Sequence, residues 1–256
     1  MGSATPEARA GFHRSEAAYA FCAALFVVVL VLTNVIGTKL FVLFPEGGPS
    51  FLFDGRPWTL TTGIITYPLT FLLTDLVSEI WGAKRANFMV LMGFLMSVLM
   101  LLILNMAVAL PPAAIWAQPG LGFEDATAMQ GAFEATFSNP RILLLASMLA
   151  YLVAQLFDVR LYHFWRRVTG GRHMWLRNNG STMISQLVDT AIVNGIFLHF
   201  SFGMQPGQIF EVILAVYLCK LVLALIDTPL IYFARNRMER FLGIPPDAAR
   251  PRAPLA

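Results

Sequence analysis

The chain has 256 residues, of which 57% are hydrophobic and only 13% are charged, whereas soluble domains carry about 25% charged residues. This composition excludes a water-soluble fold and predicts a membrane protein. The formal net charge of +3 does not indicate a nucleic-acid partner, because the basic residues stand at the ends of apolar segments, where membrane topology explains them.

Six apolar segments are each long enough to cross the lipid bilayer, since about 20 helical residues span its hydrocarbon core. The sequence predicts an all-α membrane protein with an N-terminal cytoplasmic segment (1–16), a six-helix transmembrane domain (17–236) and a disordered tail (237–256). The predicted transmembrane helices are 17–44, 59–81, 87–110, 141–165, 182–203 and 208–234.

The distribution of basic residues predicts the orientation of these helices. If the six helices alternate in direction, most of the 18 lysines and arginines fall on one side, and only Arg56 and Arg141 fall on the other. The positive-inside rule then places both termini in the cytoplasm. The longest connection, 111–140, faces outside and is expected to be a plain surface connection, with a cover over an outer entrance as the alternative.

Polar and charged residues inside the predicted helices are candidates for a binding site. An ionisable group near the bilayer centre costs at least about 2.5–3.5 kcal/mol on insertion scales, so it needs a partner, a water-filled cavity or a function. The first helix carries Asn34 and Lys39, and the second carries Asp75 and Glu79, four residues apart and therefore on one helix face.

The later helices repeat one polar pattern. Gln155 and Asp158 in the fourth helix and Gln186 and Asp189 in the fifth are both spaced as Gln-x-x-Asp, and the sixth helix carries Lys220. Such a pair offers an amide donor, an amide acceptor and a carboxylate at one height, which suits a flat heterocycle. The alternative is that these residues only join helices, since polar contacts between helices contribute about 0.6–2 kcal/mol.

The pattern also admits an internal repeat. Helices one to three and four to six would run in opposite orientations, as in the inverted repeats of many transporters. Asn34 and Lys39 would correspond to Gln155 and Arg160, and Asp75 to Asp189. We therefore include an inverted 3+3 repeat as a hypothesis.

The polar motifs together resemble those of the queuosine precursor transporter family, also called the vitamin uptake transporter family. The resemblance covers about residues 20–235 and is carried by four motifs. These are Tyr67–Ala86 (YPLTFLLTDLVSEIWGAKRA), Gln155–Val159 (QLFDV), Gln186–Thr190 (QLVDT) and Tyr217-x2-Lys220 with Pro229.

This resemblance implies an inner-membrane importer of a 7-deazaguanine, namely 7-cyano-7-deazaguanine, 7-aminomethyl-7-deazaguanine or queuine, for queuosine salvage in tRNA. A carboxylate can accept two parallel hydrogen bonds from the guanine-like edge, and Asp189 and Asp75 are the first candidates. Gln155, Gln186 and Asn34 would read the other ring positions, and Phe71 would stack on the ring.

The sequence also bears on two other classes of function. A substrate-binding membrane subunit that needs a separate ATP-driven module fits the same size, and the chain itself has no Gly-x4-Gly-Lys-Ser/Thr phosphate loop. An intramembrane enzyme is not expected, because no nucleophile motif is present. We also expect no metal and no cofactor, since the histidines and cysteines lack metal-ligand spacing, and the residues leave a homodimer open.

Overall fold

Seven α-helices and one small β-hairpin make up the described part of the chain. The computed structural model describes residues 6–37, 39–48, 55, 57–137, 141–203 and 205–244. The helices are α1 (Pro6–Ile36), α2 (Tyr67–Trp81), α3 (Ala83–Ala109), α4 (Ala126–Phe137), α5 (Arg141–Val168), α6 (Met174–Phe202) and α7 (Pro206–Leu242). Strand β1 (Leu40–Leu43) pairs antiparallel with β2 (Trp58–Thr61), with Leu40 opposite Thr61 and Leu43 opposite Trp58.

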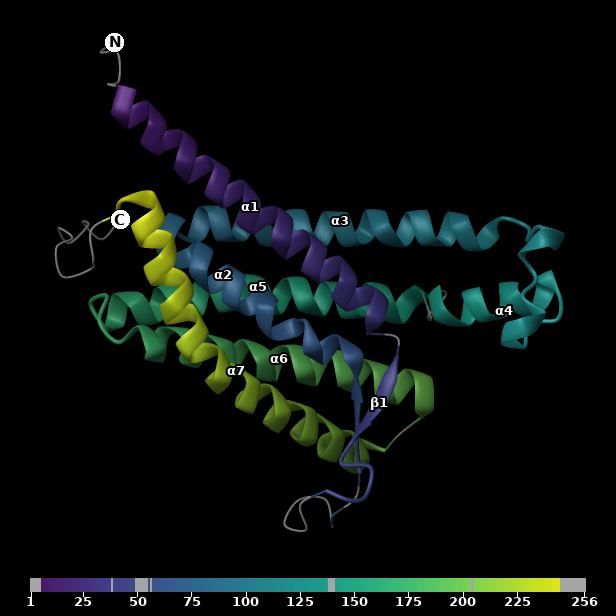
Figure 1. Ribbon diagram of the computed structural model, residues 1–256. Helices are drawn as coiled ribbons and strands as arrows, with labels where there is room; N and C mark the ends of the chain where they lie inside the picture. Colours follow the sequence, from purple (N-terminus) through teal and green to yellow (C-terminus); the bar gives the residue numbers. More distant parts are fainter. Residues whose placement is uncertain are drawn as a thin grey trace.

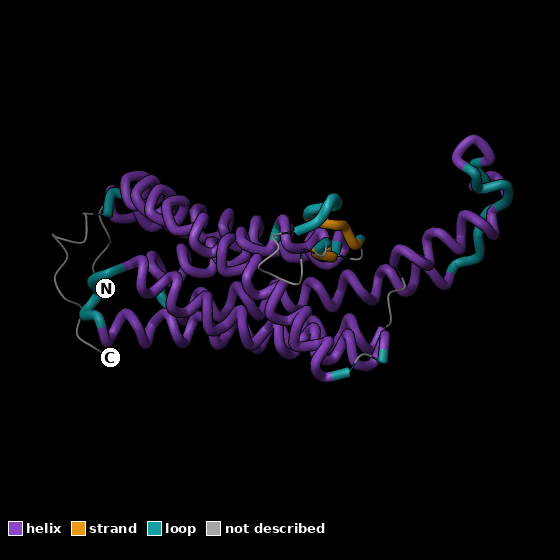
Figure 2. The backbone as a smooth tube through the Cα atoms, turned by 90° about the horizontal axis from the view of Figure 1, so that it is seen from below, coloured by secondary structure: helices purple, strands orange, loops and turns teal. Residues whose placement is uncertain are grey.

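The six longest helices, α1, α2, α3, α5, α6 and α7, pass back and forth along one bundle (Figure 1). The start of α1 and the end of α7 lie at one end of it, which we call the terminal end. The β-hairpin lies towards the other end, which we call the hairpin end, and α4 forms an arm that projects beyond it (Figure 2).

The helices have the length and composition of a membrane protein. Among the described residues, four segments are long and apolar enough to cross a membrane: Phe12–Ile36, Thr62–Trp81, Ala83–Ala109 and Ile209–Leu242. Helices α5 and α6 pack against each other, α5 also against α3, and α6 also against α7. The fold is therefore that of an all-α membrane protein.

The first two predicted helices, 17–44 and 59–81, were wrong at the ends that face each other. Helix α1 ends at Ile36, where the Gly37 N–H still donates to the Thr33 carbonyl at 2.9 Å. The chain then turns into the β-hairpin and the short helix η2 (Thr62–Ile65) before α2 begins. Short apolar runs fit a strand and a helix equally well, which explains the error.

Lys39 consequently lies outside the first helix, against expectation. It is exposed and precedes β1, and its carbonyl accepts a hydrogen bond from the Thr62 N–H at 2.9 Å. Lys39 is thus part of the turn that leads into the hairpin.

The later predicted boundaries differ in the opposite sense, because four helices are longer than expected. The third, predicted as 87–110, is Ala83–Ala109, and the fourth, predicted as 141–165, continues to Val168. The fifth, predicted as 182–203, begins at Met174. The sixth, predicted as 208–234, continues to Leu242, so residues 237–242 are helical, while 245–256 lie outside the described residues.

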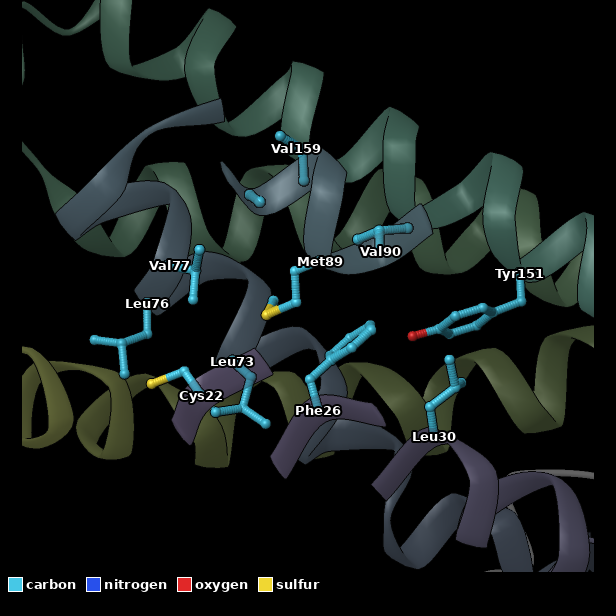
Figure 3. Packing of buried hydrophobic residues seen from close by; sticks show 11 residues of the cluster. Cys22, Phe26, Leu30, Leu73, Leu76, Val77, Met89, Val90, Tyr151 and Val159 are labelled. Atoms are coloured by element: carbon cyan, nitrogen blue, oxygen red, sulfur yellow. The ribbon is translucent and has the colours of Figure 1, made fainter. Parts of the chain in front are cut away.

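Helix α2 is the centre of the bundle. It packs against α1, α3, α5 and α7, and every residue from Thr70 to Glu79 except Leu72 is buried. Its apolar side joins a cluster in which Phe26 and Leu30 of α1 meet Met89 of α3 and Tyr151 of α5 (Figure 3).

The contact between α1 and α3 depends on Gly93. A Cβ atom at this position would lie 2.6 Å from Phe26 Cε1 and 2.8 Å from Leu30 Cδ2. Both neighbours are buried, so neither side chain can move aside without disturbing the cluster. The glycine therefore sets the close approach of the two helices.

We expect Gly93→Ala to lower the free energy of unfolding by about 1–3 kcal/mol, as overpacked cores do. Thermal unfolding of the purified protein in detergent measures the loss. Gly195→Ala is the matched control, because a Cβ there meets nothing within 4 Å and alanine favours the helix. Equal stability of the two variants would contradict this account of the α1–α3 contact.

A buried ion cluster around Glu79 holds four helices together at the terminal end. The Glu79 carboxylate accepts hydrogen bonds from Arg177 Nη2 on α6, at 2.9 Å to each oxygen, and from the Tyr162 hydroxyl on α5 at 2.8 Å. Arg235 Nη2 of α7 lies 3.6 Å from Glu79 Oε1. The Nε atom of the same arginine donates to Glu239 Oε1 at 2.9 Å. The side chains of Glu79 and Arg177 are each only 1% exposed.

We expect Glu79→Ala to destabilise the fold by about 3–5 kcal/mol, because removing one partner leaves a buried charge without compensation. The double variant Glu79→Met, Arg177→Met should lose clearly less stability than the sum of the losses in the single variants Glu79→Met and Arg177→Met. Denaturant titrations in detergent measure the free energy of unfolding of each variant. The control is Glu124→Gln, a change at an exposed carboxyl group just before α4. Additive losses would contradict a direct ion pair.

Candidate functional site

A continuous set of polar side chains lies between α2, α5, α6 and α7, and we call it the polar column. Its members are buried apart from Lys220, whose side chain is 11% exposed. They lie between the ion cluster at the terminal end and the hairpin end of the bundle. The column consists of Thr70, Thr74, Asp75, Tyr151, Gln155, Asp158, Ser181, Ser185, Gln186, Asp189 and Lys220.

Gln155 of α5 joins the column to α2. Its Oε1 accepts a hydrogen bond from Thr74 Oγ1 at 3.3 Å, and its Nε2 donates to the Tyr151 hydroxyl oxygen at 2.8 Å. Nε2 also lies 3.5 Å from Thr70 Oγ1. These contacts fix the orientation of the Gln155 amide.

Asp158 stands one turn further along α5 and faces both α6 and α2. Its Oδ1 accepts a hydrogen bond from Ser185 Oγ at 2.8 Å. Its other oxygen, Oδ2, is buried without a hydrogen-bond partner among the described residues, and so is Asp75 Oδ1 on α2.

Asp189 of α6 forms the column's second ion pair. Lys220 Nζ of α7 donates to Asp189 Oδ2 at 2.9 Å, and the side chains are 5% and 11% exposed. This contact joins α6 to α7. Gln186, one turn before Asp189, is buried, and its Oε1 accepts no hydrogen bond from the described residues.

The structure brings six of the predicted site residues together in this column: Asp75, Gln155, Asp158, Gln186, Asp189 and Lys220. Phe71 also lies on α2 and is buried. Glu79 belongs to the ion cluster, where its carboxylate pairs with Arg177. Lys39 lies apart, in the turn before β1.

Asn34 belongs to a separate polar contact between α1 and α3. Its Nδ2 donates to Ser97 Oγ at 3.2 Å. The two residues line a small pocket with Leu30, Phe94, Met148 and Tyr151. Tyr151 therefore connects this pocket to the column through Gln155.

The sequence analysis missed Tyr151, Tyr162 and Arg177. Tyr151, Gln155, Asp158 and Tyr162 follow one another at intervals of four, three and four residues, which places them along one helix face. That spacing was a usable signal for the two tyrosines. Arg177 lay outside the predicted fifth helix, 182–203, in the connection before it.

Chemically, the column supplies carboxylate, amide, hydroxyl and ammonium groups to a solute with hydrogen-bonding edges. Within the described part of the chain, no group of three or more His, Cys, Asp or Glu residues is placed to hold a metal ion. Such groups can hydrogen-bond an organic solute.

Comparisons with known proteins agree on the kind of protein. Residues 61–234 match the family described as "Putative vitamin uptake transporter", and this range contains the whole polar column but not Asn34 or Lys39. A Bacillus subtilis (strain 168) protein named "Probable queuosine precursor transporter" is 34% identical over 183 residues, 70% of this chain and 72% of its own. No solved structure matches the chain.

The polar column thus lies within the residues that match the family, and the chain belongs to the vitamin uptake transporter family of membrane proteins.

Proposed function

We propose that this protein imports queuosine precursors, namely 7-cyano-7-deazaguanine, 7-aminomethyl-7-deazaguanine or queuine, for queuosine salvage in tRNA. The name of the B. subtilis relative supports this substrate class. The observation that carries the proposal is the pairing of Asp189 with Lys220 beside the unsatisfied carbonyl oxygen of Gln186. Together they offer a carboxylate acceptor and an amide carbonyl oxygen one helical turn apart.

A guanine-type edge presents a ring N–H and an exocyclic amine side by side. The Asp189 carboxylate, which pairs with Lys220, would accept both hydrogen bonds. The Gln186 amide would contact the neighbouring ring positions, while Gln155 holds the α2 side of the site through Thr74. We leave Lys39 and Glu79 out of the proposed site, because the first lies in a turn and the second is bound by Arg177.

Six membrane-spanning helices with both termini in the cytoplasm suit this function. Helices α5 and α6 contain 28 and 29 residues and run beside the other four between the same two ends (Figure 1). At 1.5 Å per residue each is about 40 Å long, which is enough to cross a bilayer. Exposed basic residues at the terminal end, such as Arg167, Arg172 and Arg240, favour a cytoplasmic location and an inner-membrane protein.

The test is uptake of labelled 7-deazaguanines into cells that can neither make nor import them and that lack any ATP-driven vitamin importer. We expect saturable uptake with the wild-type protein. Asp189→Asn should reduce uptake about 10- to 100-fold, because hydrogen bonds to a charged group contribute about 1.5–3 kcal/mol. Glu124→Gln, the same chemical change on the exposed arm, should leave uptake unchanged.

Membrane fractions probed for the protein show whether Asp189→Asn inserts normally. Normal insertion with unchanged uptake would contradict recognition by the Asp189 carboxylate. Binding of the labelled base without uptake by the wild-type protein would favour a binding subunit that needs a separate ATP-driven module.

A further inference from the structure

Two buried carboxyl groups meet between α2 and α5. Asp75 is 1% exposed and Asp158 is 0% exposed. One turn further along the same two helices, the Tyr162 hydroxyl of α5 donates to Glu79 of α2, so the carboxyl groups four residues earlier face each other. Two adjacent buried carboxyl groups without a cation between them do not both ionise, so one of the two holds a proton.

The surroundings determine which group holds it. Asp158 Oδ1 accepts a hydrogen bond from the Ser185 hydroxyl group at 2.8 Å, which stabilises a negative charge. Among the described residues, no hydroxyl, amide or basic side chain donates a hydrogen bond to Asp75. Asp75 Oδ1 and Asp158 Oδ2 are buried and have no hydrogen-bond partner among these residues. The proton therefore belongs on Asp75, and the negative charge on Asp158.

The neighbouring cations are committed to other carboxylates. Arg177 of α6 is close enough to act on Asp75, but its Nη2 donates to both oxygens of Glu79. Arg235 of α7 pairs with Glu79 and Glu239.

The other elements add no positive charge to the pair. Lys220 of α7 pairs with Asp189. Tyr162 of α5 donates to Glu79, and Tyr151 of α5 contacts Gln155. The faces that α1 and α3 pack on this part of α2 belong to the apolar cluster around Phe26 and Met89.

We propose that the Asp75–Asp158 pair is a proton-carrying site that couples solute transport to proton movement, an inference that rests on the proposed transport function. The pair lies between α2 and α5, so a movement that separates these helices exposes it to water. When the site opens to the side of lower proton activity, the Asp75 O–H bond breaks, the electron pair stays on the carboxylate, and water takes the proton. When the site next opens to the side of higher proton activity, a hydronium ion gives a proton to the carboxylate and re-forms the O–H bond, so one proton crosses in each cycle.

Infrared difference spectroscopy of the purified full chain at neutral pH tests the shared proton without any substrate. The wild-type protein should show the band of a protonated carboxyl group, and raising the pH should remove it. Asp75→Asn should abolish this band, because the new amide donates to an ionised Asp158. Asp158→Asn should retain it, because Asp75 stays protonated. A wild-type spectrum without the band, or its loss in Asp158→Asn but not in Asp75→Asn, would overturn the assignment.

Proteoliposomes test the coupling. With labelled 7-cyano-7-deazaguanine outside and an alkaline interior, the wild-type protein should accumulate the label above the external concentration, and a protonophore should abolish the accumulation. Asp75→Asn should not accumulate the label in response to the pH gradient. This holds even if the variant still exchanges label between equal internal and external concentrations.

Two outcomes separate the two proposals. Exchange of the label by the wild-type protein without any response to the pH gradient would overturn proton coupling and leave the proposed function standing. No exchange of any 7-deazaguanine by the wild-type protein, combined with the expected infrared bands, would overturn the substrate and leave the shared proton standing.

Discussion

The burial of two carboxyl groups on α2 is the constraint on which the rest of this bundle depends. Asp75 and Glu79 are 1% and 3% exposed, and an ionised carboxylate in an apolar medium needs compensation from the chain around it. Because α2 is enclosed by α1, α3, α5 and α7, that compensation can only come from other helices. The polar faces of α5, α6 and α7 are therefore directed inwards, although the protein lies in a membrane.

The structure compensates its buried carboxylates in three different ways. Glu79 has a guanidinium partner in Arg177 together with the Tyr162 hydroxyl. Asp189 has the ammonium group of Lys220, while Asp158 has the Ser185 hydroxyl and the neighbouring Asp75 carboxyl group. The first arrangement supplies a donor to both oxygens of Glu79. In the second, Lys220 joins α7 to α6, and in the third, Asp158 Oδ2 has no hydrogen-bond partner among the described residues.

Much of this arrangement could be predicted from the sequence, because charged residues in apolar segments have few alternatives. Asp75, Gln155, Asp158 and Asp189 were identified as site residues, and the structure places all of them in the column. The family resemblance was also confirmed.

What could not be predicted was which polar residues pair. Arg177 looked like a residue of a solvated loop, since nothing local in the run Arg177-Asn-Asn reveals a partner on α2. Its partner Glu79 is 98 residues away in the chain. Lys39 was wrongly placed inside the first helix, because a short apolar run extended that predicted helix past Gly37 into what is a strand. The inverted repeat stays a prediction: Asn34 and Gln155 would correspond, yet one contacts Ser97 and the other Tyr151 and Thr74.

The position of Asp75 and Glu79 one turn apart on the same helix has a consequence for transport. Glu79 pairs with Arg177 of α6, and Asp75 lies opposite Asp158 of α5, so a single displacement of α2 relative to α5 and α6 would separate both pairs. The ion cluster lies at the terminal end, whereas the carboxyl pair lies deeper in the column. Opening the terminal end by such a movement would therefore also hydrate the proton-carrying pair. In this arrangement access and proton release depend on one helix, which links the two events without a separate signalling element.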